Sequence, residues 1–540
     1  MMKLKHMNSI TRCASVCEAY RQPTRRTLLT AGIATIVSAQ PAIVFGNPGR
    51  LGAAQKMTFD DLVLRARKGA ARAFVPAPTP ASDVMERINY AAHWKIQFRD
   101  SETLYPAGDA LPIQLFHVGR YFPSPVRIHL RGGDGTAQEV KFRRDLFEMP
   151  PDSPARALPE DIGFAGFRVM RPGLEPDWVS FLGASYFRTD GPDAQYGLSA
   201  RGIAVNTGMN VPEEFPRFTA FWIGPPEHDG DDISVWAALD GPSVTGAYRF
   251  GLVRNADGKG SVTRVSARIF LRQDVERLGI APLTSMYWYS ERDQIIGKDW
   301  RPEIHDSDGL ALETGGGERL WRPLSNPASV TTSSFFDENP RGFGLIQRDR
   351  TFDNYQDDGV FYHRRPSAWI TPSGDWGRGA VQLVEIPTED ETFDNIVAYW
   401  VPEAPTRAGD AFRFDYDIEW RARDPHPESV SRVVATRQGQ GGVAGDPVPE
   451  GVGKMVIDFD GTAFSGLDRE SGVEPVIEAR NGTIRAPVDT YPVVGTKLWR
   501  LMFDFSQTGK GPVSLRAYLR HNGEALTETW VANAWVEREG

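Results

Sequence analysis

Most of the chain alternates between apolar and polar residues with a period of two, the pattern of half-buried β-strands. The alternation is clearest over residues 126–130, 233–239, 248–253, 262–271, 381–386, 396–401, 412–420 and 513–519. Turn-forming clusters separate these segments, among them residues 132–135 and 255–258, as hairpins between antiparallel strands require. The pattern predicts an all-β protein built on a large β-sandwich.

One segment near the N-terminus has the period of a helix instead of a strand. Its apolar residues recur three or four positions apart, at Phe59, Leu62, Val63, Ala66 and Ala70. A run rich in Pro and Ala over residues 75–81 follows and cannot continue a helix. We therefore expect one amphipathic helix that ends near residue 73.

The strand pattern is interrupted once in the C-terminal part of the chain. Alternation stops at Asp424-Pro425-His426-Pro427, and a Gly-rich stretch over residues 438–453 follows. The residues beyond it hold enough strand candidates for a second, smaller sandwich of immunoglobulin-like size. We predict a large β-sandwich domain that carries the functional site over residues 55–421 and an immunoglobulin-like domain over 432–540.

The first residues have the features of an export signal. Arg25 and Arg26 precede a short, weakly apolar segment over residues 28–37, which is typical of a twin-arginine signal. We place this signal at residues 1–46 and expect a periplasmic protein. The apolar segment is too short for a hydrocarbon core of about 30 Å, so we expect no stable membrane insertion.

Composition and charge narrow the function classes. The chain has 540 residues, of which 41% are hydrophobic and 24% charged, a balance typical of folded soluble proteins. Its net charge is −9, and the first 50 residues carry seven Lys or Arg against one acidic residue. The remainder is therefore more acidic than the whole, which argues against binding of nucleic acid through its phosphates.

The motifs of known cofactor and metal sites are absent from this sequence or incomplete. Cys13 and Cys17 both precede the arginine pair, so the exported chain has no thiol for catalysis, disulfides or zinc. Gly439-x-Gly441-x-x-Ala444 resembles a dinucleotide motif, but the prolines that follow forbid the helix it needs. Asp306-x-Asp308-Gly309 lacks the rest of a calcium loop. We expect neither a cofactor nor a metal.

Acidic residues concentrate beside aromatic and arginine residues in three turn-like segments. These segments are residues 300–309, 337–366 and 385–395. Sugar sites use such side chains: rings stack on pyranose faces, arginines bind hydroxyl groups, and paired acids transfer protons. Asp and Asn also cap turns, and Arg pairs with acids on any large surface. Composition alone leaves both interpretations open.

Six longer runs carry a resemblance to a known family. They are DIGFAGFR at 161–168, FLGASYFR at 181–188, YGLSARG at 196–202, LGIAPLTSM at 278–286, HDSDG at 305–309 and DENPRGFG at 337–344. These runs are similar to those of the periplasmic glucan biosynthesis proteins of G and D type. Together with the paired arginines, they resemble the D type more closely.

The resemblance implies a fold, a location and an activity. It implies two β-sandwich domains in the periplasm, acting on the β-1,2-linked backbone of osmoregulated periplasmic glucans. Members of this family are anomer-inverting β-1,2-glucanases, and some are transglycosylases, so hydrolysis and transfer both stay open. The alternative is a non-catalytic glucan-binding protein that guides synthesis or modification of the glucan. A homodimer is also left open.

The resemblance further implies which residues form the site. Asp394 matches the general acid of the family and Asp306 its general base. The residues expected to bind substrate are Glu391, Tyr362, Arg365, Trp300, His305 and Asp308. A general acid must stay protonated near neutral pH, and a negative charge from Glu391, three positions away, can raise the pKa of Asp394.

Overall fold

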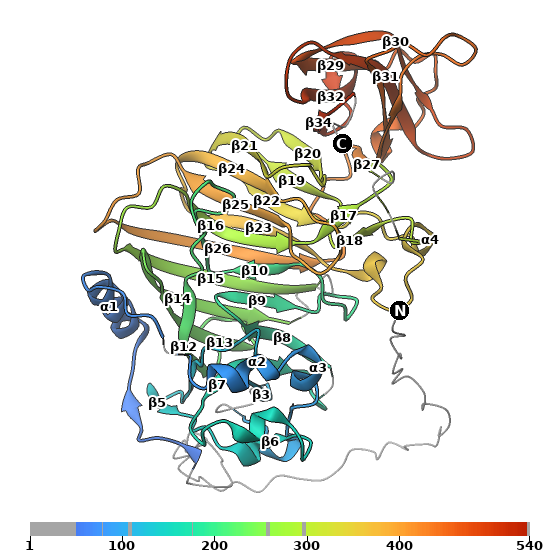
Figure 1. Ribbon diagram of the computed structural model, residues 1–540. Helices are drawn as coiled ribbons and strands as arrows, with labels where there is room; N and C mark the ends of the chain where they lie inside the picture. The colour runs from blue at the N-terminus through green and yellow to red at the C-terminus, as the bar shows by residue number, and fades with distance from the viewer. Residues whose placement is uncertain are drawn as a thin grey trace, which may run out of the picture. The chain divides into compact units, whose positions relative to one another are not determined.

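The computed structural model describes residues 50–536, except for residues 78, 106–110, 175, 255–259, 294–296 and 298. The predicted export signal, with its arginine pair and both cysteines, lies outside the described residues, as does the predicted turn at 255–258. Strands dominate the described part (Figure 1). The predicted all-β class is therefore confirmed.

The larger of the two main sheets runs through most of the chain. Its strands follow the order β1 (Gln55–Lys56), β5 (Thr136–Glu139), β4 (Arg127–Arg131), β12 (Arg217–Gly224), β13 (Ile233–Asp240), β14 (Val244–Val253), β15 (Gly260–Leu271), β26 (Ala411–Arg421), β23 (Ser367–Ser373), β22 (Gly342–Ile346), β19 (Gly309–Glu313), β20 (Arg319–Pro323), β34 (Thr529–Ala534), β32 (Val513–His521) and β29 (Glu474–Arg480). The short β33 (Glu524–Ala525) pairs with β32.

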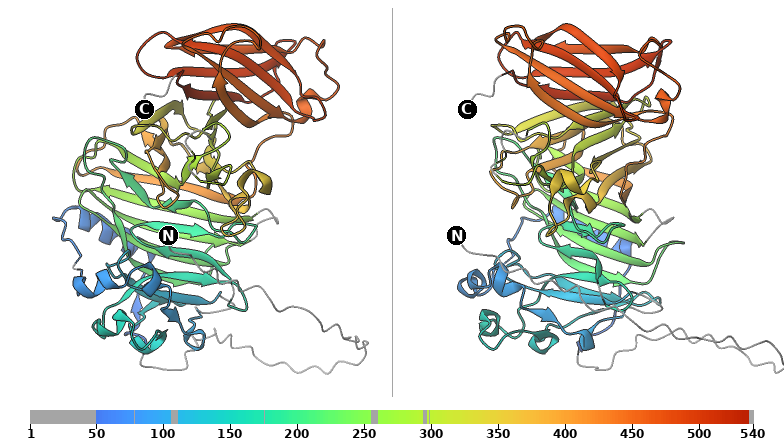
Figure 2. Two further views of the ribbon diagram at one scale, coloured as in Figure 1. Left: turned by 45° about the vertical axis from the view of Figure 1, so that its right-hand side comes forward. Right: turned by 90° about the vertical axis from the view of Figure 1, so that its right-hand side faces the viewer.

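The second sheet supplies the other layer of the sandwich. Its order is β21 (Thr331–Glu338), β24 (Arg378–Glu385), β25 (Ile396–Pro402), β16 (Leu278–Ser285), β10 (Ser199–Arg201), β9 (Tyr186–Thr189), β8 (Asp177–Leu182), β7 (Phe164–Met170) and β3 (Ile113–His117), with β11 (Ile203–Val205) beside β16. Phe167 and Phe181 of this sheet pack edge-on against Phe221 of the larger sheet, with ring centroids 5.1 and 5.6 Å apart. Figure 2 shows the two layers from other sides.

Smaller elements complete the fold. A separate sheet has the order β27 (Arg432–Gln440), β28 (Val452–Asp460), β31 (Trp499–Gln507) and β30 (Gly482–Pro492). Two-stranded ladders join β17 (Tyr287–Tyr289) to β18 (Ile304–His305) and β2 (Gln97–Phe98) to β6 (Phe147–Glu148). The described helices are α1 (Phe59–Ala70), α2 (Ser82–Arg87), α3 (Tyr90–His93) and α4 (Phe352–Tyr355).

The predicted helix is α1, and its sequence explains where it begins. Thr58 and Asp61 form a capping box, in which each side chain accepts a hydrogen bond from the other residue's backbone N–H, so that orphan donors are satisfied. The buried face of α1 packs Leu62 and Ala66 in one cluster with Trp236 of the larger sheet. The helix lies beside β14 (Figure 1).

All eight segments with clear alternation are strands, which are β4, β13, β14, β15, β24, β25, β26 and β32. The antiparallel expectation needs one correction. Strands β12 and β4 run parallel, and so do β20 and β34, because each pair joins segments far apart in sequence rather than the two arms of a hairpin.

Strand pairing crosses the predicted domain boundary. Trp321 of β20 pairs with Trp530 of β34, and both rings share one buried cluster. The Gly-rich stretch forms much of the hairpin between β27 and β28, where Gln440 pairs with Gly453. The division into domains at residues 421–432 therefore stays a prediction, while the described residues fall within one compact unit.

A buried ion pair joins the two main sheets and gives a test of the fold. The Nη2 atom of Arg322 on β20 lies 2.9 Å from Oε2 of Glu385 on β24, and both side chains are nearly inaccessible to solvent. Ser325 donates two more hydrogen bonds to Glu385. Removing one partner leaves a buried charge unpaired, so Arg322→Met should lower the free energy of unfolding by about 3–5 kcal/mol.

Chemical denaturation of two control variants checks this assignment. The double variant Arg322→Met with Glu385→Gln leaves no unpaired charge and should lose much less stability. Arg413→Met removes an exposed partner of Asp415 and should cost about 1 kcal/mol or less. Equal losses for Arg322→Met and Arg413→Met would contradict the account of the buried pair.

Candidate active site

The two predicted catalytic acids lie next to two strands, and Tyr287 contacts the residue beside each acid. Asp306 directly follows β18, and Asp394 lies two residues before β25. Tyr287 pairs with His305 in the ladder of β17 and β18. Its backbone N–H donates to Oδ1 of Asn395 at 2.8 Å, and Nδ2 of Asn395 donates back to the Tyr287 carbonyl at 2.9 Å. Tyr287 therefore fixes both His305, which precedes Asp306, and Asn395, which follows Asp394.

Asp306 is buried, with 4% of its surface exposed. Its Oδ1 atom lies 2.5 Å from Nη1 of Arg365, and its backbone N–H donates to the Met286 carbonyl at 2.8 Å. Burial raises the pKa of Asp306 to about 6, with Arg365 acting against the rise and Asp394 adding to it. At neutral pH the carboxyl is ionised and can accept a proton.

Asp394 differs from Asp306 because its side chain is exposed to solvent. The surrounding protein still disfavours its charged form and raises its pKa, against the opposing charges of Arg201, Arg188 and Arg365. Among the described residues, the Asp394 carboxyl makes neither a hydrogen bond nor an ion pair within 4 Å. Asp394 is therefore free to contact a ligand.

Each of the three arginines near Asp394 is held in place by an aromatic ring. The guanidinium carbons lie 4.7 Å from the Tyr196 ring for Arg188, 4.7 Å from the Tyr186 ring for Arg201 and 4.5 Å from the Tyr362 ring for Arg365. Arg201 also pairs with Glu213 at 2.8 Å. Stacking on a ring leaves the edges of a guanidinium group available for hydroxyl oxygens.

Arg188 and Arg201 were not predicted as site residues from the sequence. They stand on β9 and β10, more than one hundred positions before Asp306 and about two hundred before Asp394. No spacing rule links residues so far apart, and only the sheet topology brings them together. Both arginines do end or nearly end conspicuous runs, FLGASYFR and YGLSARG, which was the available signal.

Glu391 and Tyr362 contact each other, and Arg301 binds the same carboxylate. The Tyr362 hydroxyl donates to Oε2 of Glu391, while Arg301 donates to both Glu391 oxygens at 2.9 and 3.1 Å. This bidentate pair compensates the charge of Glu391. The loss of hydration near the surrounding protein, rather than the expected repulsion from Glu391, accordingly raises the pKa of Asp394.

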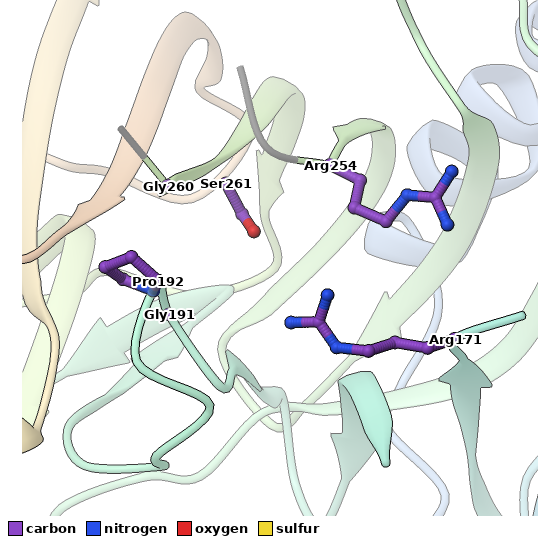
Figure 3. Close-up of a pocket in the computed structure, with 6 residues that line it drawn as sticks. All are labelled: Arg171, Gly191, Pro192, Arg254, Gly260 and Ser261. Atoms are coloured by element: carbon purple, nitrogen blue, oxygen red, sulfur yellow. The ribbon is translucent and has the colours of Figure 1, made fainter. Parts of the chain in front are cut away.

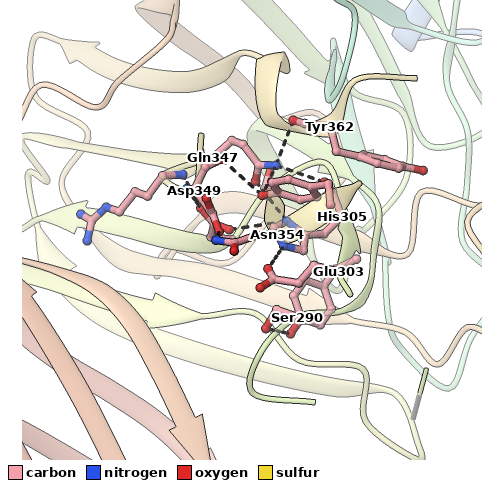
Figure 4. A network of polar contacts seen from close by, with 12 residues as sticks. Ser290, Glu303, His305, Gln347, Asp349, Asn354 and Tyr362 are labelled. Atoms are coloured by element: carbon pink, nitrogen blue, oxygen red, sulfur yellow. Dashed lines mark hydrogen bonds and ion pairs between the residues drawn. The ribbon is translucent and has the colours of Figure 1, made fainter. Parts of the chain in front are cut away.

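His305 lies beneath Asp306 rather than in contact with solvent. It has no exposed surface, and its ring nitrogens contact Gln347 and Glu303 at 3.1 Å each (Figure 4). Burial opposes its ionisation, but the hydrogen bond with Glu303 and nearby carboxylates raise the pKa of His305 to about 9. In this structure the side chain of His305 has no exposed surface and contacts only its neighbours, and its role in binding substrate stays a prediction.

Asp308 also has a supporting place in the structure. Its Oδ2 atom accepts hydrogen bonds from the backbone N–H groups of Arg348 and Asp349, the second at 2.7 Å. The Asp308 side chain thus holds the backbone at Arg348 and Asp349, shortly after the end of β22.

Two large aromatic side chains are exposed next to the acids. Trp300 is 73% exposed and precedes Arg301, and Phe393 is 69% exposed and precedes Asp394. Both rings present an exposed apolar face that can stack on a sugar ring. Trp300 was predicted as a binding residue, whereas Phe393 was not.

A polar cavity lies apart from the two acids, beside the loop that contains Gly191. Its volume is about 540 Å³, and it is lined by Arg171, Gly191, Pro192, Arg254, Gly260 and Ser261 (Figure 3). A Cβ atom added to Gly191 would lie 2.6 Å from Pro366. Neither Asp306 nor Asp394 lines this cavity.

Within the described ranges, no group of three or more His, Cys, Asp or Glu side chains is arranged to hold a metal ion. No helix in the same ranges has the length and apolar character to cross a membrane.

Comparison with known proteins gives one consistent result. Residues 57–534 match the family model described as "Periplasmic glucan biosynthesis protein, MdoG". The chain is 46% identical to "Glucans biosynthesis protein D 2" of Ralstonia nicotianae, over 94% of this chain and 97% of that protein. It is 44% identical to "Glucans biosynthesis protein D" of Xylella fastidiosa, over 90% and 92% of the two chains. The protein of that name from Xanthomonas campestris is also 44% identical, over 86% and 88%.

The ion pair at Asp306 predicts a pH-dependent effect on stability. Arg365→Met removes the cation, so the pKa of Asp306 should rise further above about 6. A carboxyl with a raised pKa in the folded state loses its stabilising contribution as pH rises through that pKa. The loss in thermal midpoint caused by Arg365→Met should therefore be larger at pH 7.5 than at pH 5.

A double-mutant cycle isolates the contribution of Asp306. In an Asp306→Asn background there is no carboxyl at this position to titrate, so most of the pH dependence of the Arg365→Met effect should disappear. An effect of Arg365→Met that is equal at both pH values would show that the pair does not control the ionisation of Asp306.

Proposed function

Because the chain belongs to the periplasmic glucan biosynthesis protein family, we propose that it acts on the β-1,2-linked backbone of periplasmic glucans as an anomer-inverting enzyme. Its role in glucan biosynthesis follows from the family itself. The linkage, the enzymatic activity and the stereochemistry are the proposal. Hydrolysis and transfer differ only in the acceptor, which is water or a sugar hydroxyl.

The observation that carries the proposal is the difference between the two acids. Asp394 is exposed, has neither a hydrogen bond nor an ion pair with its side chain among the described residues, and has a raised pKa, so it can hold a proton and deliver it to a ligand. Asp306 is buried and paired with Arg365, which keeps it ionised at neutral pH. Two carboxyl groups kept in different environments are what general acid and general base catalysis require.

The reaction then proceeds by a single displacement. Asp394 gives its proton to the glycosidic oxygen as the bond from that oxygen to the anomeric carbon breaks. Asp306 accepts a proton, directly or through an intervening hydroxyl, from the water or sugar hydroxyl whose oxygen bonds to the anomeric carbon. The proton lost by Asp394 and the proton gained by Asp306 balance, and exchange with solvent restores both groups.

The surrounding residues suit a polymer of neutral sugars. Arg188 lacks a carboxylate partner among the described residues and lies near both acids, where its N–H groups can bind hydroxyl oxygens. Trp300 and Phe393 offer exposed rings on which pyranose faces can stack. Tyr362 joins Glu391 to Arg365, and this link keeps the cation at Asp306 in place.

We also propose that the chain reaches the periplasm by the twin-arginine route. The support is the Arg25-Arg26 pair followed by a short and weakly apolar segment, since the receptor of that route reads paired arginines. Such a segment is poorly suited to the general secretory route.

Substitution of the two acids tests their roles. Asp394→Asn and Asp306→Asn should each reduce turnover of linear β-1,2-glucan by about a hundredfold or more, the scale of losing a general acid or base. Asp390→Asn is the matched control, because Asp390 is an exposed acid of the same loop whose side chain, among the described residues, bonds only to Thr392. Near-normal turnover by either test variant would remove that residue from its role. Glucan binding without turnover by the unaltered chain would favour a binding protein instead.

The stereochemistry of the product is a second test. A single displacement on a β-linked sugar should give a product that has the α configuration when it first forms. Proton NMR in the first minutes of the reaction, before mutarotation, distinguishes the two anomers. If the β anomer appears first, the reaction is a double displacement, and one aspartate must act as a nucleophile.

A further inference from the structure

A buried cluster of charged groups forms around Arg348, which follows β22. Its guanidinium group lies 2.8 Å from Oδ2 of Asp424 and 2.5 Å from Oε1 of Glu528, and it also donates to the Val433 carbonyl at 2.8 Å. The three charged side chains are each no more than 4% exposed. Glu528 directly precedes β34, so this cation binds the C-terminal strands to the sheet that carries the site.

The same residue contacts the site through its backbone. The N–H group of Arg348 donates to Oδ2 of Asp308, as does the N–H of Asp349. In return, the Asp308 N–H donates to the Ile346 carbonyl at 2.8 Å. These bonds fix Asp308 from both its backbone and its side chain, two residues after the proposed base, Asp306.

The ring of Trp321 provides a second connection between Arg348, the segment at Gly309 and the C-terminal strand β34. The Arg348 guanidinium lies 3.6 Å from the centre of the Trp321 ring. A Cβ atom at Gly309 would lie only 2.4 Å from that ring, so a side chain is excluded there and the ring packs on the backbone of Gly309. Trp321 in turn pairs with Trp530 of the C-terminal strand β34.

From these two paths we infer that Arg348 is a positioning residue, through which the C-terminal strands hold the segment from Asp306 to Gly309 in place for the reaction. The inference rests on the proposed function of Asp306 as the base. Arg348 is bonded on one side to Asp424 and Glu528 and on the other to Asp308, so a single residue connects them.

The burial of Arg348 predicts whether loss of the cluster changes kcat or KM. Arg348 is buried and lies away from the exposed groups that would contact a glucan, so substrate binding should hardly change. A displacement of the base by about 1 Å can lower a rate by roughly a hundredfold. Loss of the cluster should therefore act on kcat far more than on KM.

The test removes the cluster without leaving a buried charge. In the full-length mature protein, Arg348→Met is combined with Asp424→Asn and Glu528→Gln, which keeps size and removes all three charges. The control is Arg500→Met with Asp458→Asn, a pair between β31 and β28 with distances of 2.7 and 2.9 Å and no contact with Asp308. Two quantities are measured: hydrogen exchange of the amides over residues 304–309, and kcat and KM on linear β-1,2-glucan.

The expected result has two parts that occur together only in the cluster variant. Exchange over residues 304–309 should become about tenfold faster or more, and kcat should fall about 10- to 100-fold while KM stays within about twofold. The control should change neither quantity. Exchange and kcat that do not change together in the cluster variant would overturn the inference. A mature protein that shows no turnover before any substitution would overturn the proposed function instead, and the exchange measurement would still test the connection by itself.

Discussion

The buried carboxyl of Asp306 can stay ionised only if a cation or hydrogen-bond donors compensate it. Charge pairing at Asp306 and at the exposed Glu391 organises the loops of the site. Arg365 compensates Asp306, and Arg301 together with Tyr362 compensates Glu391. Each pair joins segments far apart in sequence. The loops are therefore positioned by charge pairing, on top of two sheets that are positioned by their apolar core.

Much of the fold followed from period-two alternation, because each strand buries one face against a continuous core. The segment 262–271 became β15, whose residues alternate between buried and partly exposed along its length. Local patterns could not predict the pairing of β20 with β34 or of β4 with β12. Such parallel partners meet through long-range packing, for which a single sequence has no periodic signal. The alternation also did not show that the Gly-rich stretch forms a hairpin, because its glycines carry no side chains that could alternate.

Only part of the candidate site could be predicted from the sequence. Its two acids and Tyr362 were predicted from the family resemblance. The structure brings His305 and Asn395, which adjoin the two acids, into contact with Tyr287. Arg188 and Arg201 were missed because they reach the site from β9 and β10 through the sheet. The burial of His305 could not be predicted, because a histidine beside an acid looks the same in sequence whether it is exposed or buried. Only the contacts with Glu303 and Gln347 distinguish the two.

The central claim is that Asp394 and Asp306 form a working acid and base pair on a β-1,2-linked glucan. Product analysis after incubation of the purified mature protein with linear β-1,2-glucan, by chromatography and mass spectrometry, tests it most directly. The account predicts that the chain-length distribution changes, to shorter glucans by hydrolysis or to rejoined and cyclic glucans by transfer. A substrate that binds but keeps its original chain lengths would contradict it.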